Sequence, residues 1–368
     1  MKDRAMIRRS VSLVALTLLA GCGYAGPASL RSTRPAYNQA IQSTNDQELL
    51  LNLVRIRYRD TTYFTSVERI AATLELNRSL GSQGVVSRTS STALKDTIAR
   101  TLTLGPGSIA LNEKPTIFYA PLEGEKFVRQ MMTPMNPDVL MLLARSGWSI
   151  DRVFALGVLE MNGLKNAPTA SGPAPSREPE FRDFRAAVRL LRLLQRDGKL
   201  DLVRAREGEG IELRFTRGSA GAPEALRFKA LAGLDPTRDY FRILVAAEAP
   251  NNQTLAITTR PVMSALHYLS TGVEVPASDV AAGRVRQTTK ADGANFDWQE
   301  MLEGLFRVRS SAKGAPEGST AVEYRGSWFY IPDDDLEAKS TFVLLTQIIA
   351  LHSSPPSGAP PISYSIGK

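Results

Sequence analysis

The stretch FRDFRAAVRLLRLLQRDGKLDLVRAREGEGIELRFT, residues 181–216, contains both kinds of element that define the fold class. In its first half, apolar side chains recur at steps of three and four, which predicts an amphipathic helix over 181–196 that ends at Asp197-Gly198. Its second half alternates apolar and polar side chains around EGEG, which predicts a β-hairpin over 202–216. Helices and strands without strict β–α–β spacing are typical of an α+β protein.

Further segments of both kinds lie on either side of this stretch. Strands are predicted at 70–76, 116–119, 239–247 and 321–331, and the apolar run at 151–164 predicts a buried strand. Helices are predicted from about residue 45 to 57 and at 124–132, 137–146, 261–269 and 336–351. We therefore expect an α+β fold with a mixed or antiparallel sheet and packed helices.

Stretches rich in Pro, Gly and Ser divide this pattern. Residues 22–44 predict a flexible tether, residues 166–180 a loop or linker, and residues 355–368 a Pro-rich tail. Between them lie a first α/β part at 45–165 and a second at 181–354. A body of this length is compatible with one large domain or two intimate ones.

The N-terminus resembles a lipoprotein signal. Lys2, Arg4, Arg8 and Arg9 precede an apolar run at 11–20, which is too short for a spanning helix, and Leu19-Ala20-Gly21-Cys22 follows. This motif resembles the lipobox of bacterial lipoproteins. The resemblance implies that residues 1–21 are cleaved as a signal peptide and that acyl groups such as palmitate anchor Cys22 in a membrane.

The residue after the cysteine bears on which membrane that is. In the lipoprotein family an Asp at this position favours the inner membrane, whereas Gly23 stands here, so the resemblance implies the periplasmic face of the outer membrane. The segments 48–60 and 324–331 are also similar to stretches of outer-membrane lipoproteins of unknown function. That similarity implies no activity.

The net charge of the mature chain indicates which kind of partner it binds. Without residues 1–21 the chain has 41 Lys and Arg against 36 Asp and Glu, a formal net charge of +5. The periplasm holds little nucleic acid, so we expect an envelope protein, anionic lipid or cell-wall polymer as partner, and no nucleic acid. Because Cys22 is the one cysteine, the body has no disulfide.

The predicted helix at 181–196 has one basic and one apolar face. The basic face consists of Arg182, Arg185, Arg189, Arg192 and Arg196. It is a candidate contact for an anionic partner, to which each near-surface arginine would add about 1 kcal/mol. The alternative, which is commoner in globular proteins, is a solvated face above an ordinary core.

Signals for catalysis or metal binding are weak. His267 and His352 lack the spacing of zinc ligands, and Gly314-Ala315-Pro316 interrupts any helix that would join Ser310 to Lys313. The aspartates at 333–335 precede a predicted helix, where carboxylates cap free N–H groups more often than they bind cations. We therefore predict no catalytic residue, metal site or cofactor.

Together these patterns predict a lipid-anchored, non-enzymatic scaffold or binding component of the cell envelope. Two alternatives stay open. One is a hydrolase acting on cell wall or lipid, because a spatial pair of carboxylates leaves no spacing rule. The other is a lipid-binding accessory protein that uses the helix at 181–196.

Overall fold

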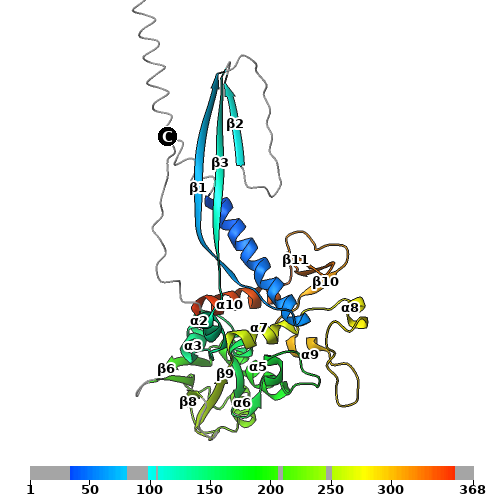
Figure 1. Cartoon of the computed structure of the whole chain (residues 1–368). Helices are drawn as coiled ribbons and strands as arrows, with labels where there is room; N and C mark the ends of the chain where they lie inside the picture. Colours follow the sequence, from blue (N-terminus) through cyan, green and yellow to red (C-terminus); the bar gives the residue numbers. More distant parts are fainter. Residues whose placement is uncertain (1–33, 81–97, 105–106, 206–209, 246–250, 353–368) are drawn as a thin grey trace, which may run out of the picture.

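The computed structural model describes residues 34–80, 98–104, 107–205, 210–245 and 251–352. Helices pack against mixed and antiparallel sheets in this part of the chain, which confirms the α+β class (Figure 1). The predicted signal peptide, Cys22 and the Pro-rich tail lie outside the described residues.

The largest sheet of the described part has the order β5-β4-β9-β8-β7-β6. Its strands are β4 (Val158–Met161), β5 (Leu164–Lys165), β6 (Leu200–Arg204), β7 (Ile211–Phe215), β8 (Tyr240–Val245) and β9 (Thr254–Thr259). All neighbours pair antiparallel except β8 and β9, which are parallel. Strands from both sides of the predicted linker at 166–180 therefore belong to one sheet. The linker itself contains a 3₁₀ turn, η1 (Pro168–Ser171), with Ala167 and Ala170 fully buried.

The prediction of a buried strand over 151–164 is wrong for its first half. Residues Ile150–Gly157 form helix α4, because Ile150, Val153 and Phe154 recur at helical spacing and all lie in the core. The strand β4 begins only afterwards. Asn162 and Gly163, both with positive φ, then form the two-residue turn that leads into β5.

The predicted helices are otherwise present. They are α2 (Glu125–Met132), α3 (Pro137–Arg145), α5 (Arg182–Arg196), α7 (Val262–Ser270) and α10 (Leu336–His352). The structure adds α6 (Pro223–Leu231) and two helices of five residues each, α8 (Ala277–Ala281) and α9 (Trp298–Leu302). Asn136 caps α3 by accepting the Asp138 N–H at 2.9 Å, and Asp335 accepts the Ala338 N–H at 3.0 Å. Among the described residues, no helix has the length and apolar character needed to cross a membrane.

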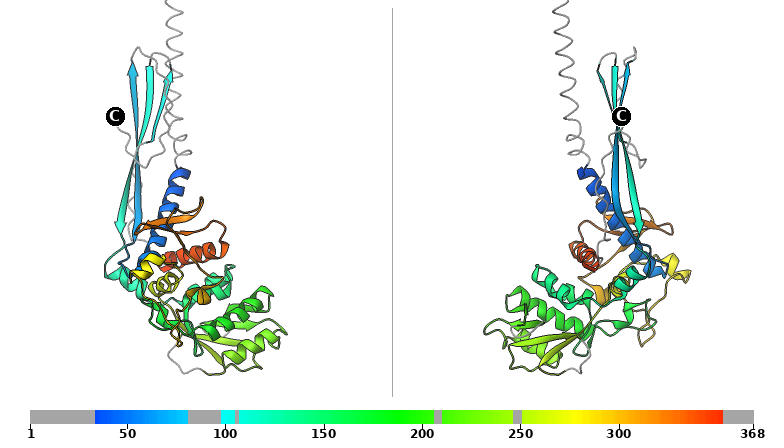
Figure 2. Two further views of the ribbon diagram at one scale, coloured as in Figure 1. Left: turned by 90° about the vertical axis from the view of Figure 1, so that its right-hand side faces the viewer. Right: turned by 60° about the vertical axis from the view of Figure 1, so that its left-hand side comes forward.

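A long first helix and a β-ribbon extend from one end of the body. The chain is helical over 34–58. The prediction of a flexible tether over 22–44 is therefore wrong for residues 34–44. Thr44 donates to the carbonyl of Ala40 and so lies inside the helix, not at its start. The ribbon pairs β1 (Thr65–Leu80), β3 (Gly107–Pro121) and β2 (Ile98–Leu104) antiparallel, and both turned views place it beside this helix and opposite the large sheet (Figure 2).

A small third sheet has the order β10-β12-β11. Its strands are β10 (Arg309–Ser311), β11 (Thr320–Tyr324) and β12 (Ser327–Ile331). The prediction of one strand over 321–331 is therefore wrong, because Arg325 and Gly326 both adopt positive φ and turn the chain back. Phe329 is fully buried and its neighbours Trp328 and Tyr330 are half-buried, as period-two alternation predicts.

Polar contacts fasten the first helix to this sheet and to α8. The Tyr58 hydroxyl donates to the buried Asp279 carboxylate at 2.5 Å, and Arg284 also donates to Asp279. Tyr324 and Arg325 both donate to Asp60, directly after the helix. The hydrogen bonds from Tyr58 and Arg284 lower the pKa of Asp279.

We predict that Asp279→Asn lowers the free energy of unfolding at pH 7 by about 2 kcal/mol, because a charged acceptor is lost from two hydrogen bonds. The folded-state pKa of Asp279 is depressed, so this contribution is complete above the unfolded pKa of about 4 and disappears as the pH falls through the folded value. Urea unfolding followed by circular dichroism between pH 2 and pH 7 measures it.

Asp201→Asn is the matched control, because Asp201 is exposed on β6 and its side chain makes no hydrogen bond or ion pair with another described residue. Its unfolding free energy should follow that of the wild type at every pH. An Asp279→Asn deficit that persists undiminished at pH 2 would contradict the role assigned to this carboxylate.

Candidate functional site

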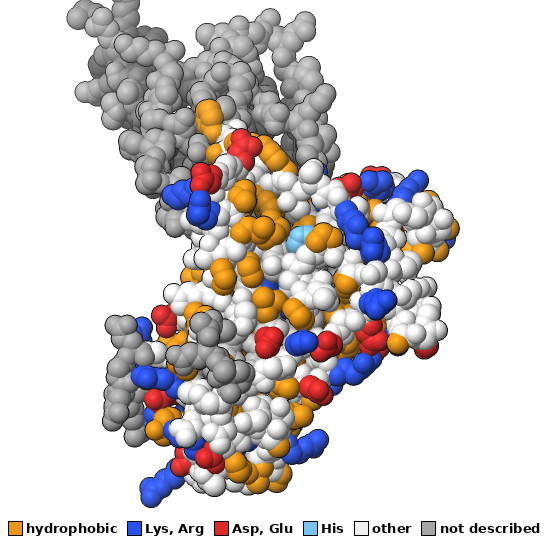
Figure 3. All heavy atoms as spheres, turned by 60° about the horizontal axis from the view of Figure 1, so that its bottom comes forward, with side chains coloured by type: hydrophobic (Ala, Val, Ile, Leu, Met, Phe, Trp, Pro, Cys, Tyr) orange, Lys and Arg blue, Asp and Glu red, His pale blue; other side chains and the backbone are white. Residues whose placement is uncertain are grey.

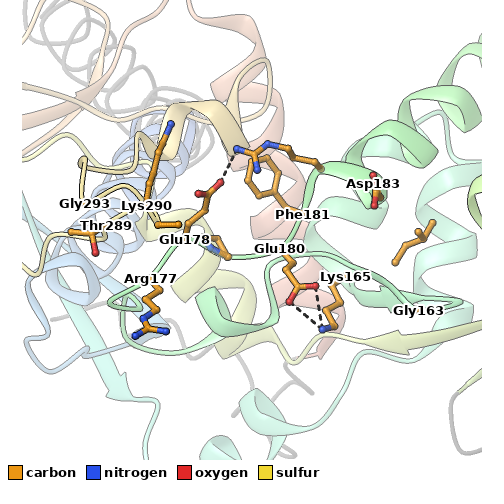
Figure 4. A pocket seen from close by; sticks show the side chains of 14 residues that line it. Gly163, Lys165, Arg177, Glu178, Glu180, Phe181, Asp183, Thr289, Lys290 and Gly293 are labelled. Atoms are coloured by element: carbon orange, nitrogen blue, oxygen red, sulfur yellow. Dashed lines mark hydrogen bonds and ion pairs between the residues drawn. The ribbon is translucent and has the colours of Figure 1, made fainter.

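A charged groove lies at the N-terminal end of α5. It has a volume of about 890 Å³ and is lined by three separate segments, at 163–165, 177–183 and 289–293 (Figure 4). The first consists of the end of the β4–β5 turn and β5 itself, the second leads into α5, and the third is a loop before α9. We call this feature the charged groove.

Backbone pairing holds two walls of the charged groove together. The N–H of Glu178 donates to the carbonyl of Thr289 at 3.0 Å, and the N–H of Thr289 donates to the carbonyl of Ser176 at 3.0 Å. Beneath them the buried rings of Phe181 and Phe296 meet edge to face, with centroids 6.0 Å apart. The groove is therefore held in shape by backbone hydrogen bonds and by ring packing, although most of its lining lies in loops.

Most charges in the charged groove are already paired. Lys165 pairs with Glu180 at 3.2 Å, as Figure 4 shows. Arg182 pairs with Glu178 at 2.7 Å and with Glu300, on α9, at 2.6 Å. The hydrogen bonds with these two carboxylates raise the pKa of Arg182, and the bond from Arg182 lowers the pKa of Glu300.

Two charged side chains of the charged groove are available to bind another molecule. Arg177 and Asp183 are exposed, and neither makes a hydrogen bond or ion pair with another described residue. The lining as a whole carries four cationic and three anionic side chains, so its excess charge is small. Such a lining matches a surface that carries both signs of charge better than it matches a polyanion.

The five arginines of α5 do not form one free basic face. Arg182 and Arg185 are directed to α9 and the residue that follows it, where Arg185 donates to the carbonyls of Glu300 and Glu303 and to the Glu303 carboxylate. The other three make longer or local pairs with carboxylates: Arg189 with Glu303 at 4.0 Å, Arg192 with Asp151 at 4.0 Å, and Arg196 with Asp197 at 3.4 Å. We call Arg189, Arg192 and Arg196 the exposed arginine row.

Charges elsewhere on the surface are also mixed. On the face drawn in Figure 3, blue and red side chains lie interspersed around a band of hydrophobic ones, without a large region of one sign. A surface of this kind steers a polyanion only weakly. The contact proposed for the α5 arginines stays a prediction.

The other candidate residues occupy structural positions. His267 is mostly buried in α7, where burial lowers its pKa, and Asp333 pairs with Lys339 at the start of α10. In the described part of the chain, no group of three or more His, Cys, Asp or Glu side chains is arranged to hold a metal ion.

Sequence reasoning missed most of the charged groove. Lys165, Arg177 and Lys290 come from segments far apart in the chain, and they follow no spacing rule. Arg182 alone was identified, because it belongs to a helical repeat.

We predict that Arg185→Gln lowers the free energy of unfolding by about 2 kcal/mol, because two carbonyl groups at α9 lose a charged donor that is only 19 % exposed. Arg189→Gln, one turn further along α5, should change it by under about 0.5 kcal/mol, because an exposed ion pair contributes little. Urea unfolding of both variants measures the difference. Equal effects would show that Arg185 does not anchor α5 to α9.

Comparisons of this chain with protein-family models, with curated proteins and with solved structures find no match. The chemistry of the charged groove and the N-terminal motif therefore carry the functional argument.

Proposed function

We propose that this chain is a lipoprotein of the bacterial cell envelope, anchored by acyl groups on Cys22 at the periplasmic face of the outer membrane, whose body binds another envelope protein without catalysing a reaction. The lipobox-like residues 19–22 and the preceding basic and apolar regions support the anchor.

The charged groove is the observation that carries the binding role. It is an open, polar groove with a volume of about 890 Å³, and the exposed Arg177 and Asp183 side chains provide one charge of each sign. Partner proteins meet such surfaces with complementary charges, which give specificity and orientation. An anionic lipid or cell-wall polymer would instead gain from a surface of one sign.

The ion pairs in the charged groove favour a binding role over a catalytic one. Catalytic acids and bases are groups whose pKa lies near the working pH. Here the pKa of Arg182 is raised and that of Glu300 is lowered, so both stay charged at neutral pH. These two groups hold the groove in shape as an ion pair and do not exchange protons at this pH.

We predict that crosslinking of the natively lipidated protein in its own membranes captures a stoichiometric envelope protein. Arg177→Glu should reduce that capture at least tenfold, because a free cation of the charged groove becomes an anion. Affinity capture followed by mass spectrometry, with the crosslinked residues mapped, provides the measurement.

Arg145→Glu is the matched control, since Arg145 is likewise exposed and without a described partner but ends α3. Capture should persist in this variant. Capture retained in Arg177→Glu but lost when the exposed arginine row is changed to Gln would move the contact along α5 and contradict the groove. Recovery of lipid or glycan fragments without any protein would overturn the proposal.

A further inference from the structure

A separate groove lies between the first helix and the small sheet β10-β12-β11, which stand side by side in Figures 1 and 2. Its volume is about 560 Å³, which is within the range of small-molecule sites. It shares no lining residue with the charged groove. We call it the aromatic groove.

Aromatic rings of two elements face this region. Alternation along β12 places Trp328 and Tyr330 on the same face of the small sheet, opposite the buried Phe329. Both rings are half-buried, and alternate residues of a strand lie about 6.8 Å apart. Trp328 lines the aromatic groove, and Tyr63, which is 53 % exposed, lines it from the chain after the first helix. A ligand in the groove therefore meets flat rings from the sheet and from this segment.

The aromatic groove also has polar groups without a partner. Gln47 on the first helix and Glu323 on β11 are exposed, and neither side chain makes a hydrogen bond or ion pair with another described residue. The indole N–H of Trp328 likewise makes no hydrogen bond within the described part of the chain. An amide, a carboxylate and an indole N–H in one groove suit a ligand whose groups both donate and accept, as hydroxyls do.

The charges around the aromatic groove balance. Arg55 and Glu48 line it from the first helix, and both oxygens of Glu48 accept from Thr65. On the sheet face, Glu323 lies opposite Trp328, and the exposed Arg309 lies opposite Tyr330. None of these four charged groups makes an ion pair with another described residue. Two cations thus stand against two carboxylates, so a polyanion gains no net attraction here.

The backbone of the small sheet favours a sugar over an extended peptide. The central strand β12 pairs with β10 on one side and β11 on the other, so a ligand on this face meets side chains and no free backbone groups. A sugar ring suits such a face, because its C–H groups stack on an aromatic ring, whose face carries partial negative charge. The hydroxyls at its rim then reach the surrounding polar side chains.

We propose that the aromatic groove binds an uncharged oligosaccharide. One sugar ring stacks on Trp328 and another contacts Tyr63, while their hydroxyls hydrogen-bond to Gln47 and Glu323. This site is independent of the partner contact proposed for the charged groove and does not rest on it.

Two uncharged trisaccharides, chitotriose and cellotriose, titrated into the purified full chain and followed by saturation-transfer NMR, test this site. We expect at least one of them to bind with a dissociation constant on the order of 1 mM or below. Trp328→Ala should weaken that binding at least about tenfold, because the stacking ring is lost. Tyr119→Ala is the matched control, since Tyr119 is an exposed aromatic on β3 outside the groove, and it should bind as the wild type does.

Tyr63→Ala keeps the test decisive if Trp328→Ala does not fold, which a thermal melt reveals. The backbone N–H and C=O of Tyr63 are held by Asn52 at 3.1 and 2.7 Å, so the segment stays in place without the ring. This variant should weaken binding about fivefold.

Two further ligands, a heparin-derived tetrasaccharide and a synthetic peptide of the Pro-rich residues 353–368, probe the alternative occupants and should bind more weakly than the better trisaccharide. Absence of binding by both trisaccharides would overturn the proposal. Tighter binding of the anionic sugar or of the peptide, or unchanged trisaccharide affinity in the folded ring variants, would equally contradict it.

Discussion

A buried cation, Arg260, holds together the parts of the body on which the charged groove depends. Its guanidinium is fully buried and donates to the carbonyl of Asn166 at 2.7 Å and to the Ser171 hydroxyl at 3.0 Å, and it stacks on the ring of Tyr268. No described carboxylate pairs with it, and burial lowers its pKa to about 10. Because a buried charge is costly unless its donors are satisfied, the loop at 166–171 and helix α7 must stay in place around it.

This constraint explains why a Pro- and Ser-rich segment is part of the core. The segment at 166–180 crosses from β5 to α5, and its buried alanines and its contacts with Arg260 fix where α5 begins. Helix α5 then forms one side of the charged groove through Arg182 and Asp183. Arg182 and Arg185 join it to α9 and to the residue that follows α9, so the five arginines do not form one free face. The charged groove therefore depends on the contacts that Arg260 makes.

Much of the fold could be predicted because local physics determines it. The helix at 181–196 carries clear periodicity, the helix at 336–351 is a long apolar run that follows three aspartates, and Asn136 and Asp335 act as the expected caps. The run at 151–164 was misassigned because a short apolar stretch suits a buried helix and a buried strand equally. The charged groove could not be predicted beyond Arg182, because Lys165, Arg177 and Lys290 come together only in the folded chain. The burial of Arg260 could not be predicted either, because it depends on contacts distant in sequence.

The central claim is that this body acts at a membrane to which Cys22 anchors it. Mass spectrometry of the N-terminal peptide, from protein extracted from its native membranes, tests the claim most directly. The account predicts a peptide that begins at Cys22 and carries a thioether-linked diacylglycerol. A peptide that contains Cys22 with a free thiol and residues before it still attached would contradict the anchor and the placement built on it.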